Sequence, residues 1–113
     1  MKSLRNSVQL IGNLGMDPEV KQVSNGNKMA RFSLATSETY KNEKGEKVTD
    51  TQWHNLIIWG GLAEVAEKYL KKGKQIAVEG RLETNTYDDK EGNRKFYTQI
   101  VVNDLVMLDG KTN

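Results

Sequence analysis

A change of hydrophobic period at Gly60 and Gly61 constrains the fold more than any other feature of this chain. Before this pair, and again from Gln75 onward, apolar and polar residues alternate, which is typical of β-strands with one buried face. The apolar residues between these regions recur at helical spacing instead, at Leu62, Val65, Ala66, Tyr69 and Leu70. Residues 71–73, Lys-Lys-Gly, form a fitting helix stop, so the pattern predicts one short helix of about ten residues.

Stretches with strand-like alternation surround this helix, three before it and two after it. They cover residues 7–15, 29–37, 51–60, 75–87 and 96–108, and residues 19–23 form a short extension closed by a turn at 24–27. Two charged tracts around glycine, residues 41–47 and 88–94, are expected to be exposed hairpin loops. A helix between the third and fourth of five strands is the order of a Greek-key OB barrel, although other small β-barrels share it. We therefore expect an all-β chain, with one five-stranded OB-fold domain at residues 1–109 and a short C-terminal end at 110–113.

The composition excludes several classes of protein. A chain of 113 residues has room for a single domain with a modest core. No apolar run approaches the ~20 residues that a membrane helix needs, and the N-terminus lacks the apolar segment of a secretory signal. Without cysteine the chain has neither disulfides nor thiolate metal sites, and a cytoplasmic location with no membrane contact is expected. The net charge of +2 means that any basic surface must be local.

The stretch at residues 51–60 holds both tryptophans and the only histidine of the chain. On a β-strand, Trp53, Asn55, Ile57 and Trp59 share one face, and His54, Leu56 and Ile58 share the other. Two large rings on one sheet face can be a core slab or a stacking platform. Because the chain has apolar faces elsewhere, we interpret the rings as the outward face of this strand. Along the fourth strand, Ile76, Val78 and Leu82 are expected inward, and Arg81 and Glu83 outward.

No group of side chains in the sequence points to catalysis, a metal or a cofactor. His54 has no cysteine partner and lies in mid-strand, which favours a hydrogen bond in the core or a subunit contact. The aspartates at residues 88–89 share a loop with Lys90 and Arg94 and offer no convergent metal geometry. The run at residues 12–15 lacks the spacing and the lysine of a phosphate loop. We therefore expect a protein that is not an enzyme and needs no cofactor.

The aromatic and basic side chains together favour binding of unstructured nucleic acid. Tyr40 and Tyr87 lie just before the two charged loops, where either ring alone would fit a packing role. A base stacked on a ring contributes ~1–3 kcal/mol whatever the sequence, and such a binder needs several rings with cations beside them. The rings are Trp53, Trp59, Tyr40 and Tyr87, and the cations are Arg31, Lys41, Lys44, Lys47, Lys90, Arg94 and Lys95. We predict that these rings stack on bases and that these cations neutralise phosphates.

Short motifs of a known family lie at consistent spacing along nearly the whole chain. They comprise residues 8–15, 17–20, 25–26, 34–38, 53–54, 62–66, 69–73 and 79–82. Through them the sequence closely resembles the bacterial single-stranded DNA-binding protein family. The resemblance implies an OB fold and a homotetramer around which single-stranded DNA wraps, with a dimer as the alternative. It also implies binding without sequence preference in replication, repair and recombination.

The resemblance also implies roles for single residues. The stacking positions of the family fall on Trp53, Trp59, Tyr40 and Tyr87. Trp59 stands in place of a phenylalanine, and the two tyrosines stand where well-studied members have tryptophan, so they offer less stacking area. His54 matches a position at the subunit interface, and Gly15 with the first strand resembles the edge through which dimers form.

Two departures from the family's pattern change what is expected. Residues 83–86 carry no basic side chain where members often have several, so binding is expected to weaken at high salt. Members generally continue past the position of Asn113 through a linker to an acidic tip that recruits partner enzymes. If the natural chain ends at Asn113, we expect no tail-mediated recruitment of such enzymes.

Two other functions remain open on the sequence alone. A primosomal adaptor of the same superfamily would act mainly through protein contacts and form dimers. The missing tail favours the adaptor, whereas the retained set of rings speaks against it. A small nuclease on an OB barrel would need convergent carboxylates and a metal, which the sequence pattern does not offer.

Overall fold

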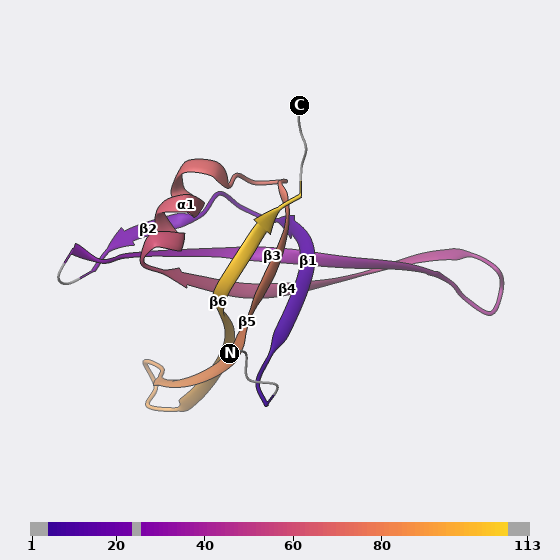
Figure 1. Ribbon diagram of the computed structural model, residues 1–113. Helices are drawn as coiled ribbons and strands as arrows, with labels where there is room; N and C mark the ends of the chain where they lie inside the picture. Colours follow the sequence, from indigo (N-terminus) through magenta and orange to yellow (C-terminus); the bar gives the residue numbers. More distant parts are fainter. Residues whose placement is uncertain (1–4, 24–25, 109–113) are drawn as a thin grey trace.

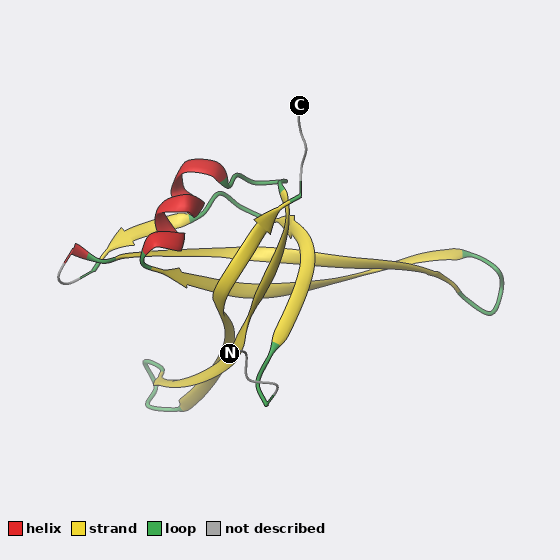
Figure 2. Cartoon of the chain, viewed as in Figure 1, coloured by secondary structure: helices red, strands yellow, loops and turns green. Residues whose placement is uncertain are grey.

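The computed structural model of this protein describes residues 5–23 and 26–108. The strands are β1 (Val8–Leu14), β2 (Glu19–Gln22), β3 (Lys28–Lys41), β4 (Lys47–Trp59), β5 (Gln75–Asp88) and β6 (Arg94–Met107), and the helix is α1 (Gly61–Tyr69) (Figure 2). The elements occur in the predicted order. The predicted turn at 24–27 lies partly outside the described residues, and the predicted C-terminal end at 110–113 lies wholly outside them.

The five long strands close into a barrel because β1 pairs with both β5 and β3. The strands follow the order β1-β5-β6-β4-β3-β2, and β1 returns to β3 through the pairs Asn13–Ala35 and Leu14–Leu34. The short strand β2 pairs with β3 and extends the sheet, as expected. α1 connects β4 to β5 and lies beside β2 and β3 (Figure 1). This arrangement confirms the predicted OB barrel, in which the helix joins the third and fourth long strands.

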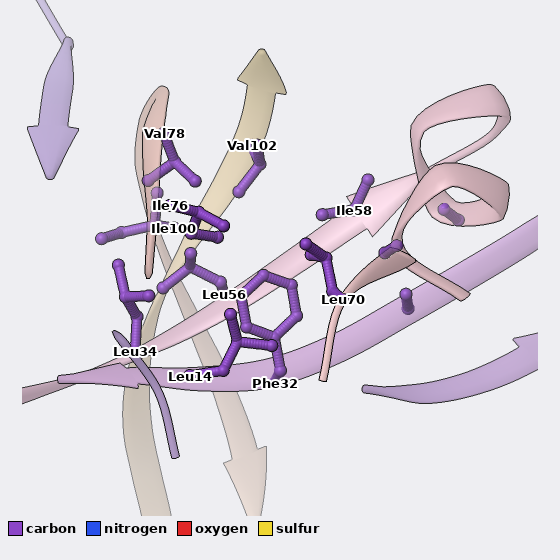
Figure 3. Close-up of a cluster of buried hydrophobic side chains, with 13 residues drawn as sticks. Leu14, Phe32, Leu34, Leu56, Ile58, Leu70, Ile76, Val78, Ile100 and Val102 are labelled. Atoms are coloured by element: carbon purple, nitrogen blue, oxygen red, sulfur yellow. The ribbon is translucent and has the colours of Figure 1, made fainter. Parts of the chain in front are cut away.

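Inward-facing aliphatic side chains fill the barrel, in line with the alternation of the strands. Leu34, Leu56, Ile58 and Ile76 are fully buried, and Figure 3 shows them gathered between the strands. Leu70, directly after α1, joins the same cluster. Burying a side chain of this size contributes roughly 1.5–3 kcal/mol. Leu56 and Ile58 therefore hold β4 in place from its inner side, and this fixes the direction of its outward side chains.

One side chain that the pattern predicted to be buried is instead exposed, and one apolar residue of the helix is exposed as well. Leu82 is 48% exposed because it lies beyond Gly80, where the pairing of β5 with β1 ends. The β5–β6 hairpin leaves the barrel at its far end (Figure 1). Tyr69, the last residue of α1, is 54% exposed, whereas Ala63 and Ala66 of the same helix are buried.

The two charged hairpin loops are shorter than predicted, and both close in the same way. Strand pairing leaves only residues 42–46 and 89–93 as loops. The first residue of each loop accepts two hydrogen bonds from backbone N–H groups through its side-chain oxygen. The bonds to Asn42 Oδ1 are 2.9 and 3.0 Å long, and those to Asp89 Oδ1 are 2.9 and 2.8 Å long. Each loop also has one glycine at positive φ, 78° and 84° respectively. This closure lets the strands run further toward the hairpin tips than the charge pattern indicated.

Candidate nucleic-acid interface

One surface of the barrel, made by outward side chains of β3, β4, β6 and β5, gathers most of the predicted rings. We call it the ring face; it runs along β4 from Trp59 to Trp53 and across β6 to Arg81 and Tyr87 on β5. Trp53 is 63% exposed and Trp59 is 48% exposed, so both rings point away from the core, as the alternation predicted. The tryptophans are therefore open to a ligand and are not a core slab.

An arginine row crosses the ring face between the two tryptophans. It consists of the successively paired residues Arg31, Ile57, Val101 and Arg81. Ile57 lies on the outward side as expected, yet it is only 6% exposed, and its neighbour Val101 is 7% exposed. The stems of flanking arginines can cover such apolar surface while their charged heads stay in water. The row thus presents two guanidinium groups. Arg81 was not among the predicted binding residues, although its outward direction was predicted from the alternation.

A polar row lies beside the arginine row, on the side of Trp53. It consists of Ser33, Asn55, Gln99 and Glu83, one residue from each of the four strands. Glu83 Oε1 accepts hydrogen bonds from Asn85 Nδ2 at 3.0 Å and from Gln99 Nε2 at 2.9 Å. These bonds hold the pKa of the Glu83 carboxyl below its ordinary value, so the group is ionised at neutral pH. The ring face therefore contains a fixed negative charge beside its two guanidinium groups.

A second pair of rings extends the ring face onto the β5–β6 hairpin. The ring centroids of Tyr87 and Tyr97 lie 5.9 Å apart with an angle of 55° between their planes. Both side chains are substantially exposed. Tyr87 was selected from the sequence but Tyr97 was not, because the contact that joins them crosses between two strands. The alternation of Tyr97 with Gln99 and Val101 is the signal that could have placed it here.

The β3–β4 hairpin extends beyond the barrel as a two-stranded arm, which carries Tyr40, Lys41 and Lys44 (Figure 1). On β3, Ala35 pairs with Trp53, and Tyr40 lies an odd number of positions further along the strand. Because side chains alternate between the two faces of a sheet, Tyr40 and Trp53 belong to opposite faces. Tyr40 is exposed, and the twist of the arm decides the direction in which it points. The structure therefore places these three residues on the arm and away from the barrel surface of the ring face.

The cations of the second hairpin lie near Tyr87. Lys95 pairs with Tyr87 across the strands, and Lys90 lies in the loop. Arg94 Nε is 3.9 Å from Asp88 Oδ1, and Lys95 Nζ is 4.0 Å from Asp89 Oδ2. Long, exposed ion pairs of this kind contribute little to stability. The cations can therefore exchange these partners for phosphates at little cost.

His54 and Gly15, the two predicted subunit contacts, also have partners within the chain. His54 Nε2 lies 3.0 Å from Thr36 Oγ1, which gives the half-buried ring a hydrogen-bond partner. A Cβ on Gly15 would overlap the ring of Trp53 and would lie 2.8 Å from Ser33 Oγ. Gly15 therefore leaves the space in which the Trp53 ring lies, a role that nothing in the sequence indicated. The subunit roles of both residues stay predictions.

Among the described residues, no group of three or more His, Cys, Asp or Glu side chains could hold a metal ion. Within residues 5–23 and 26–108, α1 is too short to cross a membrane, and no other helix there is long and apolar enough.

The sequence of this chain is similar to those of known proteins over most of its length. A sequence profile of the Single-strand binding protein family matches residues 5–108. The chain belongs to this family. It is 46% identical over 107 residues to Single-stranded DNA-binding protein 1 of Chlorobaculum tepidum, and the alignment covers 94% of this chain and 66% of that protein. It is 43% identical over 107 residues to Single-stranded DNA-binding protein 1 of Xylella fastidiosa, with coverage of 94% and 79%.

A protein of solved structure shares this fold, and a further relative matches in sequence. The chain resembles the protein in the Plasmodium falciparum SSB complex with ssDNA, with a TM-score of 0.84 and 35% identity over 96% of this chain and 98% of that one. A Neisseria meningitidis Single-stranded DNA-binding protein is 44% identical over 106 residues. That alignment covers 94% of this chain but only 61% of the Neisseria protein. The chain therefore spans less than two thirds of the length of this relative.

Proposed function

We propose that this protein binds single-stranded DNA without sequence preference, and that it is a binding protein rather than an enzyme. The observation that carries the proposal is the pair of outward tryptophans, Trp53 and Trp59, with the exposed arginines Arg31 and Arg81 in the row between them. The relatives named as single-stranded DNA-binding proteins, and the neighbouring structure that holds ssDNA, support it.

Base stacking is the main source of affinity in this mechanism. Bases stack on Trp53 and Trp59 at the barrel and on the Tyr87–Tyr97 pair at the hairpin, and each stacked base contributes ~1–3 kcal/mol. Because every base has a π-face, stacking of this kind is indifferent to sequence. Tyr40 adds a further ring on the arm.

Phosphate neutralisation supplies the second part of the mechanism. Arg31 and Arg81 lie between the stacking rings, and Lys41, Lys44, Lys47, Lys90, Arg94 and Lys95 lie on the two hairpins. The ionised Glu83 repels phosphates, so the backbone is expected to follow the arginine row rather than the polar row. Such binding would cover and protect single strands during replication, repair and recombination.

Tryptophan fluorescence tests the proposal directly. Adding oligo(dT) at low salt is expected to quench the intrinsic fluorescence, whereas a duplex at equal nucleotide concentration should quench far less. In Trp53→Phe and Trp59→Phe, the single remaining tryptophan should still be quenched, because both rings lie on the ring face. If oligo(dT) produces no quenching at low salt, the proposal is wrong.

A second copy of this chain is the partner that we propose besides DNA. β1 pairs with β5 along one edge, but it pairs with β3 only at Asn13 and Leu14, so residues 8–11 leave the other edge unpaired within the described chain. The outward side chains of Ile11, Ala77 and Val106 line up on β1, β5 and β6, and we call this surface the apolar face.

The apolar face and the unpaired edge together fit assembly into a homotetramer. Ile11 is 60% exposed and Val106 is 57% exposed, beside a hollow of about 500 Å³. Contiguous apolar side chains exposed in this way mark a protein contact. Light scattering of the purified chain is expected to give the mass of four copies. A dimer would favour the adaptor alternative, and a monomer would contradict both.

A further inference from the structure

A pocket on the ring face contains both donors and acceptors of hydrogen bonds. It has a volume of about 330 Å³, and Met16, Phe32 and Leu56 form the apolar part of its lining. The remaining lining residues are Glu19, Arg31, Ser33, Asn55, Tyr97 and Gln99. This volume lies at the lower end of the ~300–1,000 Å³ that small-molecule sites occupy. The exposed ring of Tyr97 forms part of its wall, next to side chains of the polar row and the arginine row. The pocket is thus of a size and character that suit a single nucleobase.

The orientation of the Gln99 amide in this pocket follows from its partner. Glu83 is ionised and can only accept hydrogen bonds, so the group that Gln99 offers to Glu83 Oε1 at 2.9 Å must be its NH₂. The carbonyl oxygen of Gln99 therefore points away from Glu83. Asn85 Nδ2 donates to the same carboxylate oxygen at 3.0 Å and helps to hold it in place.

The charges around the pocket decide which part of a DNA strand can enter it. Glu19 and Arg31 both line the pocket and form an ion pair that largely cancels their charges, and the ionised Glu83 lies behind Gln99, so the remaining negative charge disfavours a phosphate in the pocket. The Glu19 carboxylate and the Gln99 carbonyl are acceptors, which suit an exocyclic amino group such as N4 of cytosine. Arg31, 3.6 Å from Glu19, can donate to a ring nitrogen or carbonyl of the same base.

We propose that this pocket reads one base of the bound strand and favours a base with an exocyclic amino group over thymine. Tyr97 provides the stacking surface, Gln99 and Glu19 accept from the amino group, and Glu83 acts as the positioning residue of Gln99. The proposal rests on single-stranded DNA binding by the ring face and adds a local base preference to a surface that is otherwise indifferent to sequence.

The test compares affinities for oligo(dC), oligo(dT) and oligo(dU) of equal length within each variant. In Gln99→Leu, the ratio of oligo(dC) affinity to oligo(dT) affinity is expected to fall about fivefold from its wild-type value. The matched control Gln22→Leu, on β2 outside the pocket, should leave this ratio unchanged. Oligo(dU) should behave as oligo(dT), because both carry a carbonyl oxygen where cytosine carries its amino group.

Variants of Glu83 separate positioning of Gln99 from the effect of charge. Glu83→Leu and Glu83→Gln both remove the negative charge, but only the glutamine keeps an oxygen that accepts from Gln99. The base ratio should fall in Glu83→Leu and should be retained in Glu83→Gln. An unchanged ratio in Gln99→Leu, or oligo(dU) that behaves as oligo(dC), would overturn the proposal. If the wild-type protein does not bind oligo(dT), the proposed function itself is wrong.

Discussion

The ring face and the apolar face are two outward surfaces of one barrel, and both use β5 and β6. On the ring face, these strands present Arg81 and Tyr97, whereas on the apolar face they present Ala77 and Val106. The change occurs at a register shift between Glu79 and Gly80, where an extra residue of β6 is inserted. A bulge re-aims the side chains that follow it, so one pair of strands can serve two surfaces of different chemistry. The proposed DNA-binding surface and the proposed subunit contact therefore use different parts of the same two strands.

The largest effect is expected from removing the tryptophans of the ring face. The double variant Trp53→Ala plus Trp59→Ala loses two stacking surfaces at ~1–3 kcal/mol each, so affinity for oligo(dT) should fall about 100-fold. Fluorescence anisotropy of labelled oligo(dT) measures this loss without tryptophan as the reporter. The control is Tyr69→Ala, which removes an exposed ring from α1 and should bind as the wild type does. Equal affinity of the double variant and this control would contradict the assignment of the ring face.

A smaller loss of DNA affinity is expected from substituting Gly15, which follows β1 and leaves the space for the Trp53 ring. In Gly15→Ala, the new methyl group overlaps the Trp53 ring and displaces it, so oligo(dT) affinity should fall about tenfold. Gly61→Ala is a matched control, because its Cβ would enter open space. Anisotropy measures the affinity, and thermal unfolding of each variant checks the fold. Unchanged affinity in Gly15→Ala would show that the ring position does not matter for binding.

The apolar face is expected to control assembly instead. Ile11→Glu plus Val106→Glu places two charges on exposed positions of this face, so the particle mass measured by light scattering should fall at least about twofold. Binding of an oligo(dT) short enough for one barrel should stay within about twofold of the wild type. A large loss of this binding together with an unchanged mass would reverse the roles of the two faces.

The smallest effect is expected from single lysines in the two hairpin loops. Lys44→Ala and Lys90→Ala each remove one exposed cation, so each should reduce the slope of log affinity against log salt by about 0.7. A titration of oligo(dT) binding at several salt concentrations gives this slope. Lys68→Ala, on the last turn of α1, is the control and should not alter it. If this slope is the same in both loop variants as in the wild type, the two lysines do not contact DNA phosphates.

Much of this arrangement could be predicted because it depends on local period. Alternation along β4 correctly separated the outward Trp53 and Trp59 from the inward Leu56 and Ile58. Local period does not show where a barrel ends, and for this reason Leu82 was wrongly assigned to the core.

Features that depend on contacts between distant strands could not be predicted in this way. The contact of Gly15 with Trp53 exists because β1 returns to β3 and closes the barrel. The Tyr87–Tyr97 pair likewise depends on the register of two strands. Burial of Ile57 depends on its neighbours across the sheet, which alternation along one strand cannot show.

Crosslinking of bound DNA tests most directly the claim that bases stack on the ring face. Ultraviolet irradiation of the wild-type complex with oligo(dT), followed by mass spectrometry of the peptides, identifies the side chains that contact bases. We predict crosslinks at Trp53 and Trp59, with further ones at Tyr87 and Tyr97, and none in the segment that contains Val106. Crosslinks confined to the apolar face, with both tryptophans unmodified, would contradict the account.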